Sequence, residues 1–573
     1  MTTDYAPETF PRTWLPEHVE LKTWDQIEPW YEKLLAMPVD APEQLEAWLT
    51  AAGELNAAVG QEGTSRYVAM TCQTDDQARE AAYLEFVRDI EPKLKPYLNE
   101  VRNKFLDAPG RAGLPAERYH VFARSLENRR ALYREANIPR ETRLAELEQR
   151  YQKTVGAMTV EFQGKERTLA QLAPFLEATD RDVRREAWTL AADRRLADRD
   201  LLDGLFDEMR GLRLDVAREA GFDDYVAYAY KNRERFDYGP EQALQFHDAV
   251  ERTVVPLASA IHAERKARLG LDALRPWDLA TDPLGRAPLK PFEDVARLAE
   301  GCEAIFREVD PDLGAQFAYM RKRDLLDLGN RKGKAPGGYQ TNFEADRLPF
   351  IFMNAVGVDG DVRTLLHEGG HAFHALASRG EPLAAYRESP LEFCEVASMT
   401  MELFGTGAKD PFYADPADAE RSRRKLLEEI VTILPWIATV DAFQHWIYAR
   451  PEHSRDDRRG AWRDLVARFG GDVDWTGLEE ARDHSWHRQL HIFLYPFYYI
   501  EYGVAQLGAL QIWKRSLTDR AGAVASYRRA LSIGGARPLP RLFEAAGARF
   551  AFDRDTIAPL MDAIGEELSR LAP

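Results

Sequence analysis

The strongest chemical signal in this sequence is the run His367-Glu368-Gly369-Gly370-His371. Histidines four residues apart lie on one face of an α-helix, one turn from each other, so both imidazoles can reach the same metal ion. Glu368 follows the first histidine and can face a metal-bound water as a general base. The H-E-x-x-H spacing therefore predicts a zinc peptidase with His367 and His371 as metal ligands.

The alternative is a helix whose two histidines only pack against neighbours or face water. Gly369 and Gly370 argue against that alternative, because each Gly in a helix interior costs about 1 kcal/mol relative to Ala. We expect the two glycines to be there because another backbone or a substrate comes close to this helix.

A catalytic zinc needs three protein ligands and one open position, so the third ligand has to come from elsewhere in the chain. Metzincins place a third His six residues after the second, where this chain has Ala377. Thermolysin-like enzymes place a Glu about 19–20 residues after the second His, where this chain has Pro390 and Leu391. Neither class of zinc enzyme fits. Ser389 and Glu392 have the spacing of a capping box at the start of the next helix, which gives Glu392 a structural role. Glu395, a lone acid among apolar and small residues one turn further on, is therefore the better candidate.

Two further side chains lie close to these candidates in the sequence. A helix cannot easily aim residues 367, 371 and 374 at one ion, so we predict that His374 packs or supports a ligand. Glu402 lies two turns after Glu395, where it either orients a metal-binding imidazole or is a solvated helix charge.

Near the C-terminus, His491 is followed by several tyrosines, Tyr495, Tyr498, Tyr499 and Tyr502. Peptide hydrolysis at zinc passes through a tetrahedral oxyanion, which needs hydrogen-bond donors beyond the metal. A Tyr hydroxyl or a His side chain can supply one, whereas any single Tyr could equally belong to an aromatic core. For the cluster with His491 we favour the functional interpretation.

The elements that must position these residues are mainly helices. Apolar residues three and four positions apart predict helices over 42–55, 76–105, 140–155 and 180–220. Strand signals are few: residues 159–168 predict a hairpin, and residues 348–353 predict a strand just before the metal helix. Pro349 favours an edge position for that strand, because proline cannot donate to the ladder.

Composition limits the class of protein. The chain has 573 residues, which predicts two or more lobes, and a formal net charge of −18, which disfavours a nucleic-acid partner. The three cysteines, Cys72, Cys302 and Cys394, suggest neither a disulfide framework nor a thiolate zinc site. Because the N-terminus lacks an apolar h-region and no run of about 18 apolar residues occurs, we expect a cytoplasmic protein without a membrane partner.

Together these motifs resemble the thimet oligopeptidase / oligoendopeptidase F family of zinc metallopeptidases. Residues 367–374 resemble the family's zinc helix, although Gly369 stands where a larger residue is usual, and residues 395–399 resemble the segment whose Glu is the third zinc ligand. Residues 334–339 resemble its Gly-rich loop, residues 349–354 the strand before the zinc helix, and residues 491–502 its His/Tyr segment.

The similarity covers about residues 200–573, and it implies a mainly α fold. The implied architecture is a two-lobed helical metallopeptidase with a deep substrate channel and a small β-sheet beside the zinc helix. Residues 1–195 would form an N-terminal helical region that is part of the channel wall, and residues 196–573 the catalytic domain. The channel would admit short unstructured peptides, and strand 350–353 would pair with the extended substrate.

The resemblance also implies a role for each site residue. The implied ligands of one catalytic Zn²⁺ are His367, His371 and Glu395. Glu368 would take a proton from the zinc-bound water and later give it to the leaving amine. The side chains implied to stabilise the oxyanion or hold substrate carbonyls are His491 and one or more of Tyr495, Tyr498, Tyr499 and Tyr502. These roles predict a zinc-dependent endopeptidase that cuts internal bonds of short oligopeptides.

Two other functions fit part of the same pattern. A zinc carboxypeptidase of similar helical fold would need a cation that grips the terminal carboxylate of its substrate, and Arg387 is one candidate. A non-catalytic helical scaffold with a vestigial metal site would bind metal without turnover, but it would not need the carboxylate of Glu368.

Overall fold

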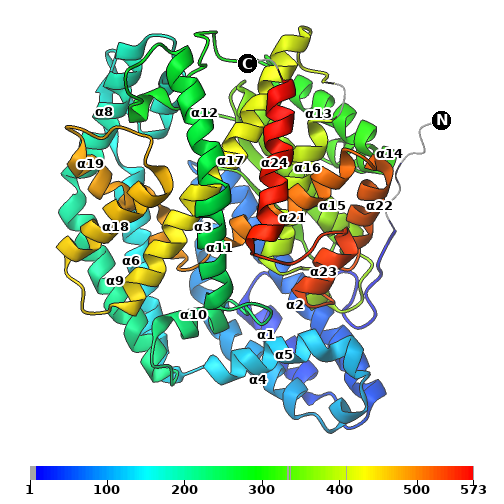
Figure 1. Ribbon diagram of the computed structural model, residues 1–573. Helices are drawn as coiled ribbons and strands as arrows, with labels where there is room; N and C mark the ends of the chain where they lie inside the picture. The colour runs from blue at the N-terminus through cyan, green and yellow to red at the C-terminus, as the bar shows by residue number, and fades with distance from the viewer. Residues whose placement is uncertain (1–4, 6–7, 332–333, 336, 408–409, 572–573) are drawn as a thin grey trace. The chain divides into compact units, whose positions relative to one another are not determined.

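The computed structural model describes residues 5, 8–331, 334–335, 337–407 and 410–571, and these residues form mainly helices with two small sheets (Figure 1). The predicted mainly α fold is therefore confirmed. Contacts divide the chain into two compact units: unit 1 is Met1–Ala131, Lys290–Ala419 and Gly508–Phe550, and unit 2 is Leu132–Leu289, Glu420–Leu507 and Ala551–Pro573. The predicted domain boundary at residue 195 stays a prediction.

Unit 1 contains the helices that carry the H-E-x-x-H motif and Glu395. Its elements are α1 (Trp24–Ala36), α2 (Pro42–Cys72), α3 (Gln77–Glu85), α4 (Glu91–Asp107), α5 (Ala116–Leu132), α13 (Val295–Val309), α14 (Pro311–Lys322), β3 (Leu326–Gly329), β4 (Tyr339–Phe343), β5 (Leu348–Ala355), α15 (Asp359–Ser378), α16 (Leu391–Gly405), α22 (Arg520–Leu531) and α23 (Leu539–Ala546).

Strand β5 is the central strand of the three-stranded sheet in unit 1, parallel to β3 and antiparallel to β4. The predicted strand is thus confirmed, but its edge position is wrong. Pro349 fits because pairing with β3 begins only at Ile351, so Pro349 has a strand neighbour on one side alone. The expectation that residues 350–353 pair with substrate is also wrong, because β3 and β4 flank this strand on both sides.

The start of helix α15 is fixed by the carboxylate of Asp361, which accepts hydrogen bonds from backbone N–H groups just before the helix. Asp361 Oδ2 accepts hydrogen bonds from the N–H groups of Val356, Gly357 and Val358 at 2.8, 2.8 and 3.0 Å. Gly357 has a φ of 93°, in the left-handed region that suits glycine. An acid in the first turn also stabilises the positive end of the helix. These contacts fix the start of the helix that carries the motif.

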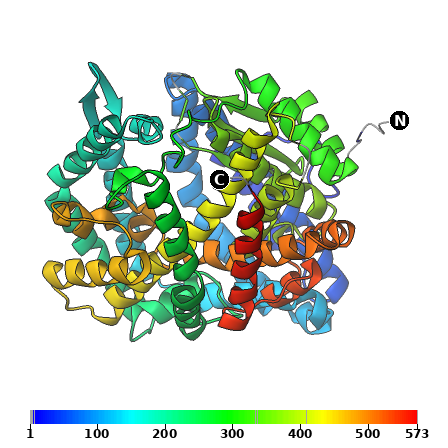
Figure 2. The same cartoon turned by 45° about the horizontal axis from the view of Figure 1, so that its top comes forward.

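Unit 2 contains the His/Tyr segment. Its elements are α6 (Ile138–Gly156), β1 (Thr159–Phe162), β2 (Lys165–Thr168), α7 (Ala173–Leu176), α8 (Arg181–Ala197), α9 (Arg199–Glu219), α10 (Tyr225–Asn232), α11 (Pro240–Thr253), α12 (Val255–Arg268), α17 (Pro416–Ala449) from Glu420 on, α18 (Arg455–Gly470), α19 (Glu479–Asp483), α20 (Leu490–Leu494), α21 (Ile500–Ser516) up to Leu507 and α24 (Arg554–Arg570). The predicted hairpin is confirmed as the antiparallel pair β1–β2, visible as two arrows in Figure 2.

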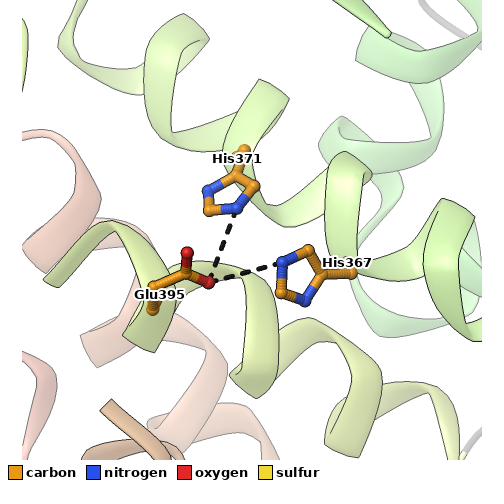
Figure 3. A group of neighbouring side chains, drawn as sticks. All are labelled: His367, His371 and Glu395. Carbon is orange, nitrogen blue, oxygen red and sulfur yellow. Dashed lines mark ion pairs between the residues drawn. The ribbon is translucent and has the colours of Figure 1, made fainter. Parts of the chain in front are cut away.

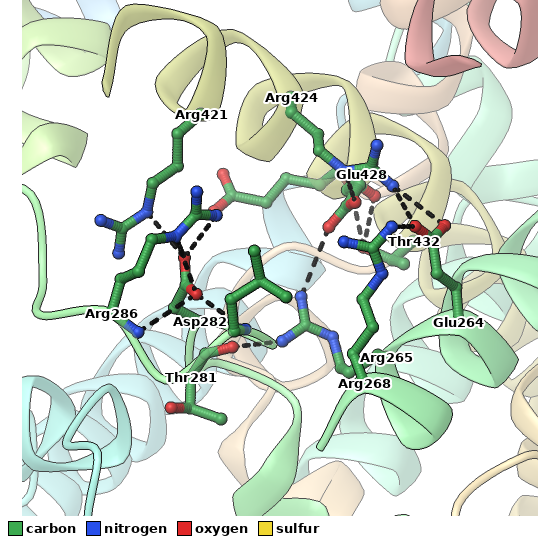
Figure 4. Close-up of polar contacts among 12 residues, drawn as sticks. Glu264, Arg265, Arg268, Thr281, Asp282, Arg286, Arg421, Arg424, Glu428 and Thr432 are labelled. Carbon is green, nitrogen blue, oxygen red and sulfur yellow. Dashed lines mark hydrogen bonds and ion pairs between the residues drawn. The ribbon is translucent and has the colours of Figure 1, made fainter. Parts of the chain in front are cut away.

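Arginine–carboxylate pairs join α12, α17 and the loop after α12 within unit 2 (Figure 4). Arg424 donates to both oxygens of Glu264 at 3.0 and 2.9 Å and to Glu428 at 2.7 Å. Arg421 Nε lies 2.7 Å from Asp282 Oδ2, and its side chain is 14% exposed. Because these charges share partners and lie largely out of solvent, they stabilise the unit more than isolated surface pairs do.

None of the helices in the described part of the chain combines the length and the apolar character that crossing a bilayer requires.

Candidate active site

Three side chains of unit 1 converge on one point between α15 and α16 (Figure 3). His367 Nε2 lies 3.4 Å and His371 Nε2 lies 3.7 Å from the same oxygen, Oε2 of Glu395. The three ligand atoms all lie within 4.8 Å of one another. The structure thus brings together the three residues that the sequence predicts as metal ligands.

These spacings fit a divalent zinc ion. Zinc–nitrogen and zinc–oxygen bonds of about 2.0–2.2 Å in a tetrahedron require ligand atoms about 3.3–3.5 Å apart. The two distances to Glu395 Oε2, 3.4 and 3.7 Å, are close to that range. Two imidazole nitrogens and one carboxylate are a common ligand set in catalytic zinc sites, where the fourth coordination position stays open for water or substrate. The residues present therefore fit the metal that the sequence implies.

Gly370 lets α15 and α16, the two helices that carry the converging side chains, touch. A Cβ atom at this position would lie 2.6 Å from Ser398 Cα and 2.7 Å from Ala397 O, both backbone atoms of α16. At Gly369 a Cβ would instead lie 2.4 Å from Cζ of Phe306, whose ring fills the space that a larger side chain would take. The expectation that another backbone comes close to the motif helix is confirmed for Gly370.

Two of the three converging side chains, His367 and Glu395, are held by a neighbour. Glu402 Oε1 lies 2.7 Å from His367 Nδ1, which leaves Nε2 of that ring to face the metal position. Ser398 Oγ donates to Glu395 Oε2 at 3.0 Å. Glu402 therefore has the orienting contact, the first of the two roles that its position in the sequence allows.

His374 is not part of the converging group, and its side chain meets the residues just before α16. Its Nε2 lies 3.0 Å from Ser389 Oγ, and the residue is 4% exposed. The predicted capping box is wrong: α16 begins at Leu391 with Pro390 as its N-cap, without a capping hydrogen bond from a side chain. The Ser389 hydroxyl is bonded to a buried imidazole instead, and Glu392 is itself buried at 6% exposure.

Glu368 lies on α15 between the two histidines and is buried at 8% exposure. Burial raises the pKa of Glu368 to about 7, and the neighbouring carboxylates of Glu395 and Glu402 act in the same direction, against the charge of His367. A carboxyl group with a pKa near neutrality can both accept and return a proton, as a general base in hydrolysis must.

The predicted His/Tyr residues lie in unit 2, apart from this group in the chain, and they gather around one imidazole. Tyr498 stacks on the ring of His491 with centroids 5.4 Å and planes 28° apart, and the Tyr499 ring lies 4.8 Å away. Tyr502 and Tyr495 follow at 5.8 and 6.2 Å. The structure thus brings His491 together with all four tyrosines of the segment.

Arginines from α9 and from the end of α10 hold the main chain of this segment. Arg213 donates to carbonyl groups within α20, and Arg233 Nε donates to Pro496 O at 2.7 Å. Arg235 donates to Phe497 O, and its side chain is fully buried. Phe497 has a φ of 62°, a conformation that costs a non-glycine residue on the order of 1 kcal/mol or more. Sequence reasoning missed these arginines, because nothing in their spacing links them to residues some 260 positions later.

Comparison with known proteins identifies the family of the chain. The sequence profile of peptidase family M3 matches residues 175–561. Oligopeptidase PepF from Bacillus subtilis (strain 168) is 24% identical over 310 residues, covering 51% of this chain and 44% of that protein. An oligoendopeptidase F homolog from Lactococcus lactis subsp. lactis (strain IL1403) is 30% identical over 180 residues, covering 29% of each chain. The chain spans less than half of the length of these curated relatives.

The fold has close counterparts among solved structures. PZ peptidase A with an inhibitor superposes with a TM-score of 0.89 and 29% sequence identity, covering 97% of this chain and 98% of the other. The profile match extends over more than half of the sequence, so the resemblance predicted from the motifs is confirmed.

Proposed function

This chain belongs to peptidase family M3, and on that premise we propose that it is a zinc-dependent endopeptidase acting on internal bonds of short, unstructured oligopeptides. The observation that carries the proposal is the convergence of two imidazole nitrogens and one carboxylate oxygen beside the buried Glu368. A site that only bound metal would not need the second carboxylate, that of Glu368.

His367, His371 and Glu395 are the side chains that would hold the ion. When bound, zinc would supply Lewis-acid polarisation of a water molecule and of the peptide carbonyl. Glu402 supports this arrangement, because its contact with His367 Nδ1 fixes the ring so that Nε2 faces the other ligands.

Glu368 would act as general base and then as general acid. Its carboxylate accepts a proton from the attacking water and returns it to the nitrogen of the leaving amine. Burial raises the pKa of Glu368 and so makes it a better base for water, whereas the charge of a bound zinc ion would act in the opposite direction.

His491 and one or more of the tyrosines around it would donate hydrogen bonds to the oxyanion or to substrate carbonyls. Burial, and then the charge of Arg233, lower the pKa of His491 to about 4, so the imidazole is neutral at pH 7. A neutral imidazole donates from one nitrogen only, and the ring nitrogen that carries the proton therefore matters for this role.

The substrate backbone would pair with the outer edge of β4. The backbone N–H of Ile351 in β5 donates to Leu325 O and therefore points towards β3, away from β4. Gln340 of β4 lies opposite Ile351, so these two residues form a non-hydrogen-bonded pair of the antiparallel ladder. The N–H and C=O of Gln340 then point away from β5. An extended peptide can add to such an edge through main-chain bonds, which makes recognition largely independent of side chains.

A quenched fluorescent peptide of about ten residues, amidated at its C-terminus, tests the proposal. We would compare the wild type with Glu368→Gln after measuring the zinc content of both. Glu300→Gln, at an exposed position of α13, is the matched control for the loss of one carboxylate. We expect cleavage by the wild type and the control, and loss of cleavage in zinc-loaded Glu368→Gln.

The same peptide separates the alternatives. Cleavage of the free acid but not of the amide would indicate a carboxypeptidase and refute the endopeptidase. Zinc-loaded wild type that cleaves neither peptide would indicate a scaffold. Arg387, the candidate carboxylate grip, donates to the carbonyls of Glu381 and Pro382, which does not favour the carboxypeptidase.

The cellular location stays a prediction. Cys72, Cys302 and Cys394 are free thiols, which is compatible with the cytoplasm expected from the sequence, because disulfides are rare in that reducing compartment.

A further inference from the structure

Trp436 and Gln489 form a hydrogen-bonded chain that ends on His491, within unit 2. Trp436 Nε1 lies 3.0 Å from Gln489 Oε1, and Gln489 Nε2 lies 2.8 Å from His491 Nδ1. Gln489 is 9% exposed, so bulk water does not compete strongly for either contact. The indole comes from α17, the amide from the residue before α20, and the imidazole from α20 itself.

The indole determines how the amide is oriented. A tryptophan Nε1–H can only donate, so the atom of Gln489 that faces Trp436 has to be the carbonyl oxygen. The amide nitrogen then faces His491, and because an amide NH₂ can only donate, Nδ1 of His491 has to accept. The reverse orientation of the amide would set two donors against each other at Trp436. The Tyr499 hydroxyl lies near Gln489 and Trp436 and can accept from the same NH₂ group.

Acceptance at Nδ1 requires a neutral imidazole, and the surroundings of His491 provide for that. The ring is buried, and the nearby guanidinium of Arg233 disfavours a second positive charge, so its pKa is lowered to about 4. The rings of Tyr495, Tyr498, Tyr499 and Tyr502 also lie against this imidazole.

We propose that Gln489, itself oriented by Trp436, is a positioning residue that fixes His491 in the tautomer carrying its proton on Nε2. This tautomer makes Nε2 a hydrogen-bond donor at all times near neutral pH. The catalytic consequence rests on the proposed function, in which His491 donates to the oxyanion or to a substrate carbonyl. The tautomer itself is a property of the protein alone and does not depend on that function.

An amide is suited to this task in a way that a carboxylate is not. A carboxylate at position 489 would accept from Trp436 and would also draw the histidine proton to Nδ1, leaving Nε2 as an acceptor. Gln489→Glu is therefore a change of nearly identical shape that should exchange donor and acceptor on His491. Gln489→Met removes the contact without imposing the opposite tautomer.

Nitrogen-15 NMR of histidine-labelled protein at pH 7 reads the tautomer directly, with the His491 signals assigned by their loss in His491→Gln. In the wild type we expect an unprotonated, pyridine-type Nδ1 and a protonated, pyrrole-type Nε2. In Gln489→Glu we expect the two patterns to exchange, or both nitrogens to become protonated. Gln245→Glu, at an exposed position of α11, is the matched control and should leave the His491 signals unchanged.

Peptide cleavage by the zinc-loaded proteins gives the second measurement. Because Gln489→Glu removes one oxyanion donor, we expect kcat to fall by about 10²–10³ with KM little changed. In Gln489→Met we expect kcat to fall about two- to tenfold, which is the effect of losing one neutral hydrogen bond. A role of Gln489 in folding alone would lower stability without exchanging the nitrogen signals.

A wild-type spectrum with the proton on Nδ1 would overturn the inference, as would a Gln489→Glu spectrum identical to the wild type. Kinetics of Gln489→Glu equal to those of the wild type would overturn its catalytic part. If the wild type shows the expected tautomer but cleaves no peptide, the tautomer inference stands and the proposed function fails. If Gln489→Glu does not fold, the wild-type and Gln489→Met spectra still decide the tautomer.

Discussion

Gly370→Ala is the most direct test of how the fold builds the metal site. The added methyl group would lie 2.6 Å from Ser398 Cα, whereas non-bonded carbon atoms rest about 3.5 Å apart or more. Neither helix can relieve this by turning a side chain, because the atoms approached belong to the backbone of α16. The two helices would have to separate by about 0.9 Å, the difference between these two distances.

The metal site is less tolerant of that separation than the fold is. Overpacking of this kind costs about 1–3 kcal/mol, and part of that cost is offset by about 1 kcal/mol of better helix propensity. Metal ligands, in contrast, must keep their distances within about 0.2 Å. Since Glu395 lies on α16 and both histidines lie on α15, we expect zinc affinity to fall at least 10–100-fold, as for loss of a supporting contact.

Competition for zinc with a chromogenic chelator measures this affinity, and thermal unfolding in excess chelator measures the fold separately. Gly60→Ala is the matched control, because this exposed glycine of α2 has nothing within 4 Å of an added Cβ. We expect Gly60→Ala to bind zinc like the wild type and to gain up to about 1 kcal/mol of stability. Unchanged zinc affinity in Gly370→Ala would refute the argument that this glycine sets the approach of the two helices.

Two further substitutions address other parts of the molecule. Glu402→Gln keeps the shape but removes the charged acceptor of His367, so we expect a 10–100-fold weaker zinc affinity, and chelator competition that matches the wild type would contradict this. At Asp203, burial acts to raise the pKa, but the hydrogen bond from His487 and the charge of Arg458 lower it from 3.8 to about 2. The stabilisation is therefore complete above about pH 4 and is lost as pH falls towards 2, and it amounts to about 2 kcal/mol. Urea unfolding at pH 3 and pH 6 should show this loss in the wild type and not in Asp203→Asn, and equal pH dependence of both proteins would contradict the assignment.

The sequence predicted the parts of the site that depend on local spacing. His367 and His371 converge because four residues make about one helical turn, and Glu395 could be singled out because an unpaired acid in a buried helix needs a partner. The hairpin around Gln163-Gly164 was predictable for the same reason: both residues have positive φ, as a tight turn between two strands requires. Helix periodicity likewise found α6, predicted over 140–155 and observed as Ile138–Gly156.

The parts that depend on tertiary contacts were not predictable from local patterns. The edge assignment for the strand of Pro349 failed because the place where β3 begins to pair is set by another segment of the chain. The capping box failed because the hydroxyl of Ser389 meets His374. The helix predicted over 180–220 is divided into α8 and α9 at Asp198, a break that the apolar periodicity does not show. The orientation of Gln489 follows only from its contact with an indole more than 50 residues earlier.

The discontinuous make-up of unit 1 has a consequence for the order of events during synthesis. Its segments end at residues 131, 419 and 550, so α22 and α23, which pack against α15 and α16, leave the ribosome more than 100 residues after the metal-binding pair. A nascent chain thus carries all three proposed metal ligands before this packing is complete. Pairing between segments so distant in sequence is slow, and the apolar surfaces of α15 and α16 are exposed in the meantime. Early zinc capture would hold these two helices together during that interval, making the metal a folding aid for the growing chain as well as a reagent for the finished enzyme.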